Sequence, residues 1–221
     1  MKAFRIKLTS WTSSFRYPNI ISGFQPTLEV PPISTVLGLL NACAGKYLFH
    51  ENLQIGYCFQ YGGKNVDLET IYQFAVDDNG APKNDVKSNV IKREFLYDCT
   101  LYIYLLNYDL VEFFKHPHYP ILLGRSNDLA SVVTIDEVVL PEICKANKIK
   151  GQVIPFANNY LPGTIQALPK YFTDEIPRRT IGAEAYSIIP FGSMDYPSQL
   201  TAYRDVIDGN EIDIYFHNIS M

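Results

Sequence analysis

Residues 36–44 (VLGLLNACA) form an almost wholly apolar segment that lies between strong helix-start and helix-stop signals. Two prolines and Ser34 precede the segment, and Gly45 follows it. Serine at a helix N-cap accepts hydrogen bonds from the first free amides, and glycine adopts the left-handed conformation that ends a helix. We therefore expect a helix from Ser34 to about Ala44. Because this helix is apolar on nearly every side, we expect it to be deeply buried against a sheet.

Patterns typical of β-strands occur on both sides of this helix. Residues 4–9 alternate between apolar and polar side chains, which is the two-residue period of a half-buried strand. Runs rich in β-branched and aromatic residues at 54–61, 90–106 and 131–140 predict further strands, and residues 108–115 predict a short helix. The order strand, helix, strand, strand, helix, strand predicts an α+β domain with the ferredoxin-like (RRM-like) arrangement shared with RNA-recognition domains.

A hairpin and a C-terminal extension complete the predicted organisation. Residues 77–82 combine Asp, Asn, Gly and Pro, which is the chemistry of a tight turn. We expect residues 76–92 to form an extended, polar and basic hairpin tip that projects from two central strands. After about residue 148, prolines, glycines and short β-type runs predict a second unit. We therefore assign residues 1–148 to the α+β domain, hairpin included, and residues 149–221 to a small β-rich lobe.

The charge of the chain is distributed unevenly. Its formal net charge is −4, whereas nucleic-acid-binding domains are usually basic. However, residues 1–28 hold four basic and no acidic side chains, and residues 83–93 hold four basic side chains against one acidic. Either segment alone would be interpreted as a solvated face. Two such segments in an acidic chain favour a binding site for a polyanion.

The sequence carries no signal for a membrane span, a signal peptide, a metal site or a cofactor. No stretch approaches about 18 consecutive apolar residues, and the N-terminus lacks a continuous apolar run. Zinc sites need closely spaced cysteines, and disulfide scaffolds are shorter and denser in cysteine. The four widely spaced cysteines predict reduced, mostly buried thiols in a cytoplasmic protein: Cys43, Cys58, Cys99 and Cys144.

The loop after the first strand contains the residue types that bind single-stranded nucleic acid. Hydroxyl groups and cations bind phosphates, and flat rings stack on unpaired bases. The N-terminal amides of a helix starting at Ser34 would add further phosphate donors. Phe15 and Tyr17 could equally form a small core within the loop, and this alternative stays open. The loop supplies these side chains together: Ser13, Ser14, Phe15, Arg16 and Tyr17.

Several stretches resemble a CRISPR-associated family. SFRYP at 14–18 and TLEVPPISTVLGLLNACAG at 27–45 closely resemble its N-terminal signature, and KREFLY at 92–97 and LGRSNDLA at 123–130 match it further. The chain thus resembles the fifth Cas protein family, RAMP-type subunits of Cascade surveillance complexes, and within it the type I-B branch. The matches span residues 4–130, whereas residues 150–221 contribute little.

The resemblance implies a fold and a role. The fold is a ferredoxin-like palm with a β-hairpin thumb and a smaller C-terminal β lobe. The role is to cap the 5′ handle of the mature CRISPR RNA (crRNA) within Cascade, in antiviral defence or guided targeting. The subunit would lie beside the large subunit and the first backbone subunit, and would reach target DNA only through the complex. It would need no cofactor, no metal and no membrane.

Carried over by position, the resemblance assigns RNA contacts to particular residues. The loop after the first strand and the helix start should hold handle phosphates and bases, and the thumb should kink the guide. Arg125 and Ser126 lie in a family loop that either touches RNA or braces the palm. The residues expected to contact RNA are Arg5, Lys7, Ser13, Ser14, Phe15, Arg16, Tyr17, Ser34, Thr35, Lys83, Lys87, Lys92, Arg93, Arg125 and Ser126.

An enzymatic alternative belongs to the same family. In its type I-C branch, the fold cleaves precursor crRNA without metal, through a tyrosine, a lysine and a histidine. No such set is local in this sequence, so we predict no catalytic residue and keep a metal-independent endoribonuclease as the alternative. We expect the acidic stretch from Asp174 onward to face a protein partner. Arg178, which lies in it, should therefore matter less for RNA than Arg16.

Overall fold

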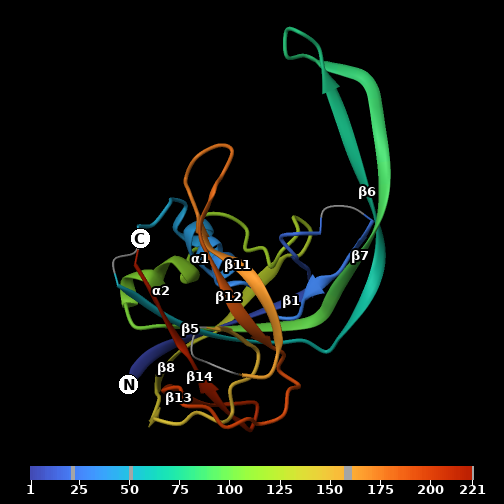
Figure 1. Ribbon diagram of the computed structural model, residues 1–221. Helices are drawn as coiled ribbons and strands as arrows, with labels where there is room; N and C mark the ends of the chain where they lie inside the picture. Colours follow the sequence, from blue (N-terminus) through green and yellow to red (C-terminus); the bar gives the residue numbers. More distant parts are fainter. Residues whose placement is uncertain (21–22, 50–51, 157–160, 221) are drawn as a thin grey trace.

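A seven-stranded sheet forms the centre of the computed structural model, which describes residues 1–20, 23–49, 52–156 and 161–220 (Figure 1). Five of its strands lie side by side in the order β15-β5-β7-β1-β8, each antiparallel to its neighbour, and β3 and β6 add to the outer part of β7. The bounds are β1 Lys2–Ser13, β3 Phe24–Gln25, β5 Leu53–Gln60, β6 Gly63–Val76, β7 Pro82–Leu105, β8 Ala130–Val139 and β15 Phe216–Ile219.

Two helices follow the predicted chain order. Helix α1 (Ile33–Ala44) connects β1 to β5, and α2 (Tyr108–Lys115) connects β7 to β8. The α+β class and the position of each predicted element are thus confirmed. Helix α1 ends as predicted, because Gly45 is left-handed with φ of 70°. The prediction of Ser34 as the N-cap is wrong: Pro32 occupies that position, and no described side chain caps the helix.

The central sheet is covered on both faces. On one face, α1 and α2 pack against alternate residues of the strands, such as Ile6 of β1 and Ile103 of β7, in the largest core cluster. On the other face, Tyr102 and Tyr104 of β7 pack against a pair of strands near the C-terminus, β13 (Ala202–Ile207) and β14 (Asn210–Ile214). The open sheet face through which RNA-recognition domains bind RNA is therefore occupied by the chain itself where these strands lie.

The C-terminal part of the chain is β-rich, as expected, but its strands join three different sheets. One is a three-stranded sheet that packs on α1, a second covers the opposite face of the central sheet, and β15 extends the central sheet itself. A two-stranded ribbon lies after β1. The bounds are β2 Phe15–Arg16, β4 Thr27–Leu28, β9 Glu142–Ile143, β10 Gln152–Pro155, β11 Thr164–Phe172, β12 Thr180–Ile189, β13 Ala202–Ile207 and β14 Asn210–Ile214.

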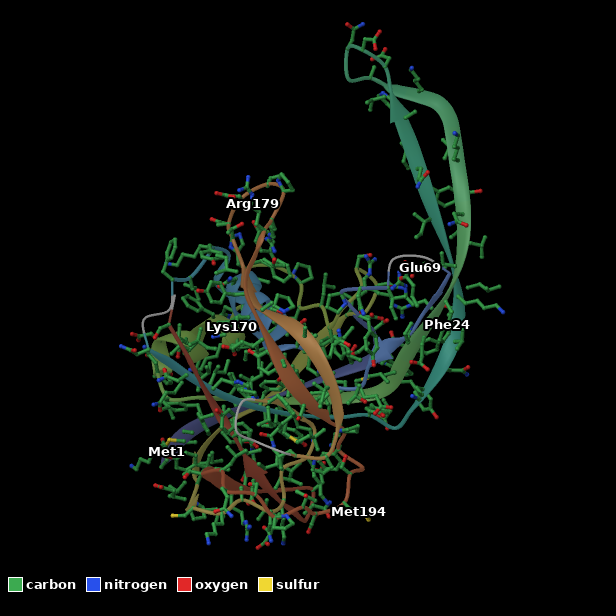
Figure 2. The ribbon with its side chains drawn as sticks, in the orientation of Figure 1. Met1, Phe24, Glu69, Lys170, Arg179 and Met194 are labelled. Carbon is green, nitrogen blue, oxygen red and sulfur yellow. The ribbon has the colours of Figure 1, made fainter. Side chains whose placement is uncertain are left out.

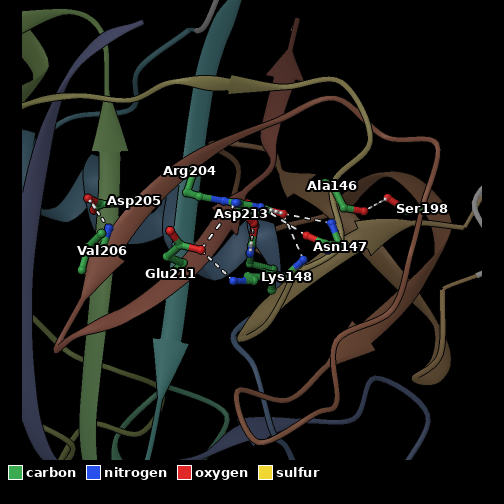
Figure 3. A network of polar contacts seen from close by, with 10 residues as sticks. Ala146, Asn147, Lys148, Ser198, Arg204, Asp205, Val206, Glu211 and Asp213 are labelled. Carbon is green, nitrogen blue, oxygen red and sulfur yellow. Dashed lines mark hydrogen bonds and ion pairs between the residues drawn. The ribbon is translucent and has the colours of Figure 1, made fainter.

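A buried carboxylate ties this C-terminal part together (Figure 3). Asp213 accepts hydrogen bonds from Arg204 Nε at 2.7 Å and from the amides of Asn147 and Lys148 at 2.9 and 3.0 Å. Although burial alone would raise the pKa of the Asp213 carboxyl, these hydrogen bonds lower it below its usual value. The network fixes the segment before β10 to the β13–β14 pair.

Strands β6 and β7 form a long arm that projects away from the body (Figure 1). The turn at its tip is the predicted one: Asp77 accepts hydrogen bonds through Oδ1 from the amides of Asn79 and Ala81. Pairing begins at Gly63 with Tyr97, so the hairpin includes strand residues on both sides of the predicted tip. The predicted segment 76–92 is thus the outer part of a larger arm.

Candidate nucleic-acid interface

A cleft of about 680 Å³ opens beside the N-terminal half of α1. Its other walls are the loop after β1, the loop at 122–126 and strand β11 with the turn that follows it. The cleft brings together residues that the sequence predicts as RNA contacts, from three segments of the chain (14–16, 34–35 and 125–126). These are Ser14, Phe15, Arg16, Ser34, Thr35, Arg125 and Ser126.

Arg16 supplies a free positive charge at this cleft. Strand β2 pairs with β4, so Phe15 and Arg16 point to opposite sides: the Phe15 ring packs edge-on against Phe59 at 5.4 Å, and Arg16 is exposed. Within the described part of the chain, the Arg16 guanidinium has neither a hydrogen bond nor an ion pair. A cation held at a cavity wall without a partner is suited to bind an anionic ligand.

The start of α1 forms the adjacent wall. Ser34 and Thr35 are half-buried and line the cleft in the first turn of the helix. Because no described side chain caps this end, the partial positive charge of the helix N-terminus is available to a bound anion. Hydroxyls, helix amides and the Arg16 guanidinium therefore surround one space, and together they are suited to hold phosphate groups.

The loop at 122–126 approaches the main chain of the β1–β2 segment closely. A Cβ atom at Gly124, which has φ of 116°, would lie 2.2 Å from the carbonyl oxygen of Ser14, so only glycine fits there. Arg125 donates from Nε and Nη2 to the fully buried Asp128 at 3.0 and 2.9 Å, and this pairing raises its pKa. Of the two interpretations of Arg125, its pairing with Asp128 favours a bracing role, while Ser126 is exposed at the cleft.

Arg5 and Lys7 lie elsewhere, on the sheet face that β13 and β14 cover. Arg5 Nη1 donates to Asp205 at 2.9 Å, and Lys7 Nζ lies 4.0 Å from Asp208. The positive charge of β1 is thus matched by acidic residues about 200 positions later. The expectation that these two cations contact RNA is not supported by their placement, because their charges are already paired inside the chain.

Four other predicted contacts are buried. Ser13, Ser14 and Phe15 are 0%, 4% and 3% exposed, and the Ser14 hydroxyl donates to the Glu94 carbonyl at 2.9 Å. Arg93 is 1% exposed and ion-paired with Glu69. A buried ring cannot stack on a base. Phe15 therefore follows the other interpretation, in which its ring belongs to a core. Tyr17 packs partly on the core and lines a different, smaller cavity with Glu29 and Glu94. These residues offer little accessible surface to a ligand, although Ser14 and Phe15 form part of the cleft wall.

The basic residues of the arm do not form one patch. Lys83, Lys87 and Lys92 are exposed, but pairing places Lys87 opposite Gln73 and Lys92 opposite Leu68, on opposite faces of the hairpin. They line none of the described cavities at the cleft. Figure 2 shows Glu69 on the lower part of the arm, and it is this residue of the arm that reaches the cleft.

The β11–β12 hairpin contributes residues that the sequence did not indicate. Phe172 and Arg178 line the same cleft as Arg16, so the expectation that Arg178 faces only a protein partner is not supported by its position. The neighbouring Arg179 lies at the hairpin tip (Figure 2), paired with Glu175 and outside the cleft lining. The local sequence indicates this wall only through a pair of arginines in an acidic stretch. That pattern does not predict that the β11–β12 hairpin packs on α1.

Comparisons with known proteins give a fold but no sequence family. No protein-family model matches the chain, and no curated protein matches it. Among solved structures, a chain of a CRISPR RNA-guided surveillance complex is similar with a TM-score of 0.56 and 15% identity, over 88% of this chain and 91% of that one. A chain of the type III-B Cmr-beta complex bound to cognate target RNA and AMPPnP is similar with a TM-score of 0.53 and 12% identity, over 90% and 86%. The chain thus has the fold of proteins found in CRISPR complexes.

Two further findings bear on the earlier expectations. In residues 1–20, 23–49, 52–156 and 161–220, no helix is long and apolar enough to cross a membrane. The same described residues contain no group of three or more His, Cys, Asp or Glu side chains arranged to hold a metal ion. The absence of a metal or cofactor from the function stays a prediction.

Proposed function

We propose that this protein is a non-catalytic, RNA-binding subunit of a CRISPR RNA-guided complex, and that it caps the 5′ handle of the crRNA. The observation that carries the proposal is the cleft beside α1, where the unpaired Arg16 faces the uncapped helix start with Ser34 and Thr35. The similarity in fold to chains of CRISPR complexes supports the same role. The resemblance described above supports placing it in a type I-B Cascade in the cytoplasm.

In this proposal the body of the protein is a ferredoxin-like palm and the β6–β7 arm is its thumb. The strand order β8-β1-β7-β5, with one helix after β1 and one after β7, is what a split βαβ arrangement requires. The large subunit and a backbone subunit are the proposed partners. Exposed apolar residues along the arm, such as Leu68 at 65% and Phe74 at 68%, support contact with another protein.

Binding of handle RNA by the purified protein tests the proposal directly. Arg16→Ala should weaken binding about tenfold and reduce the slope of log K against log salt by about one, because one phosphate contact is lost. Filter binding at several salt concentrations, with handle RNA and a scrambled RNA of equal length, measures both effects. Arg179→Ala is the matched control and should change neither quantity. Equal affinity of Arg16→Ala and wild type would contradict the proposal.

A second candidate function is metal-independent cleavage of precursor crRNA. The observation that favours it is the fold of the 116–119 loop onto the end of α1: the His118 amide donates to the Cys43 carbonyl at 2.9 Å, and the His118 ring lies against Gly45. This brings a histidine close to Lys46 and Tyr47, which sequence alone does not group. A base that takes the proton of a ribose 2′-hydroxyl lets that oxygen attack the neighbouring phosphate, giving a 2′,3′-cyclic phosphate and a protonated 5′-oxygen leaving group.

Incubation of repeat RNA with the protein in EDTA separates the two functions. Site-specific cleavage that disappears in both His118→Ala and Tyr47→Phe would replace the binding role with the nuclease. Intact RNA that remains bound at the end of the incubation supports capping alone.

A further inference from the structure

A second cavity, of about 370 Å³, lies beside the C-terminal half of α1. Its walls carry four aromatic rings from three separate parts of the chain. Tyr47 follows the helix, Tyr119 lies in the loop after α2, and Tyr171 and Phe172 end strand β11. Its volume is within the range of small-molecule sites, and a cluster of rings around such a space is suited to hold a flat ligand.

This aromatic cavity is continuous with the cleft described above. Both are lined by Ser34, Gly38 and Ala42 on one side of α1, and by Phe172 and Arg178 on the opposite wall. A strand that lies in the cleft with its phosphates near Arg16 would therefore pass directly to the aromatic cavity. A single-stranded nucleic acid has the required form, because its phosphates and flat bases alternate along one chain.

The rings are held in place by contacts within the protein. The Tyr119 amide donates to the Ala42 carbonyl at 3.3 Å, and the Tyr119 ring packs edge-on against His118 at 4.6 Å. The Tyr47 hydroxyl donates to the Phe172 carbonyl at 2.8 Å, which ties the end of β11 to the segment after α1. These contacts fix the main chain at Tyr119 and Phe172 and the ring of Tyr47, so the walls of the cavity are formed before any ligand binds.

Polar groups at the same cavity suit the edge of a base. Asn41 accepts a hydrogen bond through Oδ1 from the Leu48 amide at 3.2 Å, which fixes its amide plane, and its Nδ2 has no partner among the described residues. Asp174 adds a carboxylate, and Lys46 and Arg178 add positive charges. Amide and carboxylate groups hydrogen-bond to base edges, and the cations suit the flanking phosphates.

Gly38 marks the junction of the two cavities. It lies exposed in the middle of α1, and a Cβ atom built there would meet no other atom within 4 Å. Glycine inside a helix destabilises it by about 1 kcal/mol relative to alanine. Packing within the chain does not require glycine at this position, and the absence of a side chain leaves the helix main chain accessible from the cavity.

We propose that the aromatic cavity binds one unstacked nucleobase of the RNA strand that occupies the cleft, with Tyr119 and Phe172 as stacking surfaces and Asn41 as a reader of the base edge. The inference rests on the proposed function and makes it more specific. It assigns base recognition to a site formed jointly by α1 and the β11–β12 hairpin.

Fluorescence anisotropy with the full chain and labelled ten-nucleotide RNAs tests this site. The probes are oligo(A), oligo(U), oligo(C) and an abasic ribose-phosphate chain of equal length. Tyr119→Ala should weaken binding of the probes that carry bases by about 5- to 150-fold, the loss of one stacking contact. It should leave the abasic probe unchanged, and Tyr119→Trp should restore affinity. Tyr196→Ala, which removes a similarly exposed ring outside both cavities, is the control and should have no effect.

Two further variants sharpen the test. Asn41→Ala should reduce the differences in affinity between the three bases, because it removes the group that reads the base edge. Gly38→Ala should raise the melting temperature of the free protein and weaken RNA binding, since the new methyl group occupies space meant for the strand. Unchanged binding by Gly38→Ala, or unchanged base preference in Asn41→Ala, would count against the site.

The outcomes distinguish this inference from the function on which it rests. If no probe binds wild type, both fail. Suppose that Arg16→Ala weakens binding of every probe. If Tyr119→Ala then weakens binding of no probe, or weakens binding of the abasic probe as much as that of the probes with bases, the cleft binds RNA and the base site is refuted. If free AMP or UMP displaces the labelled RNA as effectively as unlabelled oligonucleotide, the cavity is a nucleotide site and the strand assignment is overturned.

Discussion

Two hairpins project from the body of this protein, and they differ in almost every respect (Figure 1). The β6–β7 arm carries the basic segment 83–93 and is predictable from sequence, yet its exposed lysines lie on opposite faces and away from the cleft. The second half of the β11–β12 hairpin belongs to the acidic stretch that begins at Asp174, yet the hairpin places Phe172 and Arg178 in the cleft. The difference teaches that the charge of a segment is a poor guide to the charge of the surface that it helps to form.

The two hairpins are also anchored differently. β11 and β12 contribute Leu168, Tyr186 and Ile188 to the largest core cluster, so the hairpin rests on the body over much of its length. The arm extends beyond the core, and alternate residues of β6 (Leu68, Tyr72, Phe74 and Val76) form an exposed apolar face to which β7 adds Val86 and Val90. An isolated two-stranded hairpin is marginally stable in water, so the arm is the element that most needs a partner.

The largest effect should come from this apolar face. The double variant Leu68→Asp/Phe74→Asp should abolish assembly with partner subunits, because two charges would be buried in the interface without partners. It should change the affinity of the free protein for handle RNA by less than about twofold, since neither residue lines the cleft. Co-purification and filter binding measure the two effects. Normal assembly of the variant would show that the arm is not a protein-binding element.

A pH effect of intermediate size should affect the body and not the arm. His217 of β15 is fully buried between Tyr57 and Tyr215, and burial lowers its pKa to about 4. The unfolded chain, with a histidine pKa near 6.5, binds the proton more readily, so stability falls as pH decreases from about 6.5 to 4. The loss at pH 4 should be about 3 kcal/mol.

Urea unfolding at pH 7 and pH 4 measures this loss, and His217→Phe should remove most of it. Hydrogen exchange should show more frequent opening of β10, β12 and β15 at the lower pH, while the opening of the arm is the same at both pH values. If the wild-type free energy of unfolding is the same at both pH values, the folded protein binds the His217 proton as readily as the unfolded chain does. That result would contradict the lowered pKa of His217.

The smallest effects should separate the two hairpins residue by residue. Arg178→Ala should weaken RNA binding about tenfold, because it removes a cation from the cleft, whereas Lys87→Ala on the arm should change it less than twofold. Both are single-cation deletions at exposed positions, so each is a control for the other. Anisotropy at one fixed salt concentration is sufficient. The reverse order of effects would assign RNA binding by the free protein to the arm.

Local pattern explains why the elements could be predicted. The apolar segment after Pro32, the alternation in β1 and the turn at Asp77 each specify their structure through nearby residues. The wrong prediction of Ser34 as the N-cap has a local cause as well. The extended conformation of Pro32, with ψ of 151°, starts the helix one residue before Ser34.

The candidate site could be predicted only in part, because its walls meet through tertiary packing. Arg16 and Ser34 belong to one recognisable stretch, whereas Arg178 follows about 140 residues later and reaches the cleft only because β11 packs on α1. The same reason explains the misplaced cations. Arg5 looks unpaired in a segment without acidic residues, and the carboxylate that neutralises it, Asp205, comes from the far end of the chain.

Strand β7 connects the arm mechanically to the middle of the molecule. It runs for 24 residues, at most about 80 Å, from the tip of the arm to its pairing with both β1 and β5. A force applied at the tip is therefore carried along one continuous strand into the hydrogen bonds of the central sheet. The left-handed Asp98, with φ of 54°, lies next to the first β6–β7 pair, where this strand passes from the central sheet into the arm.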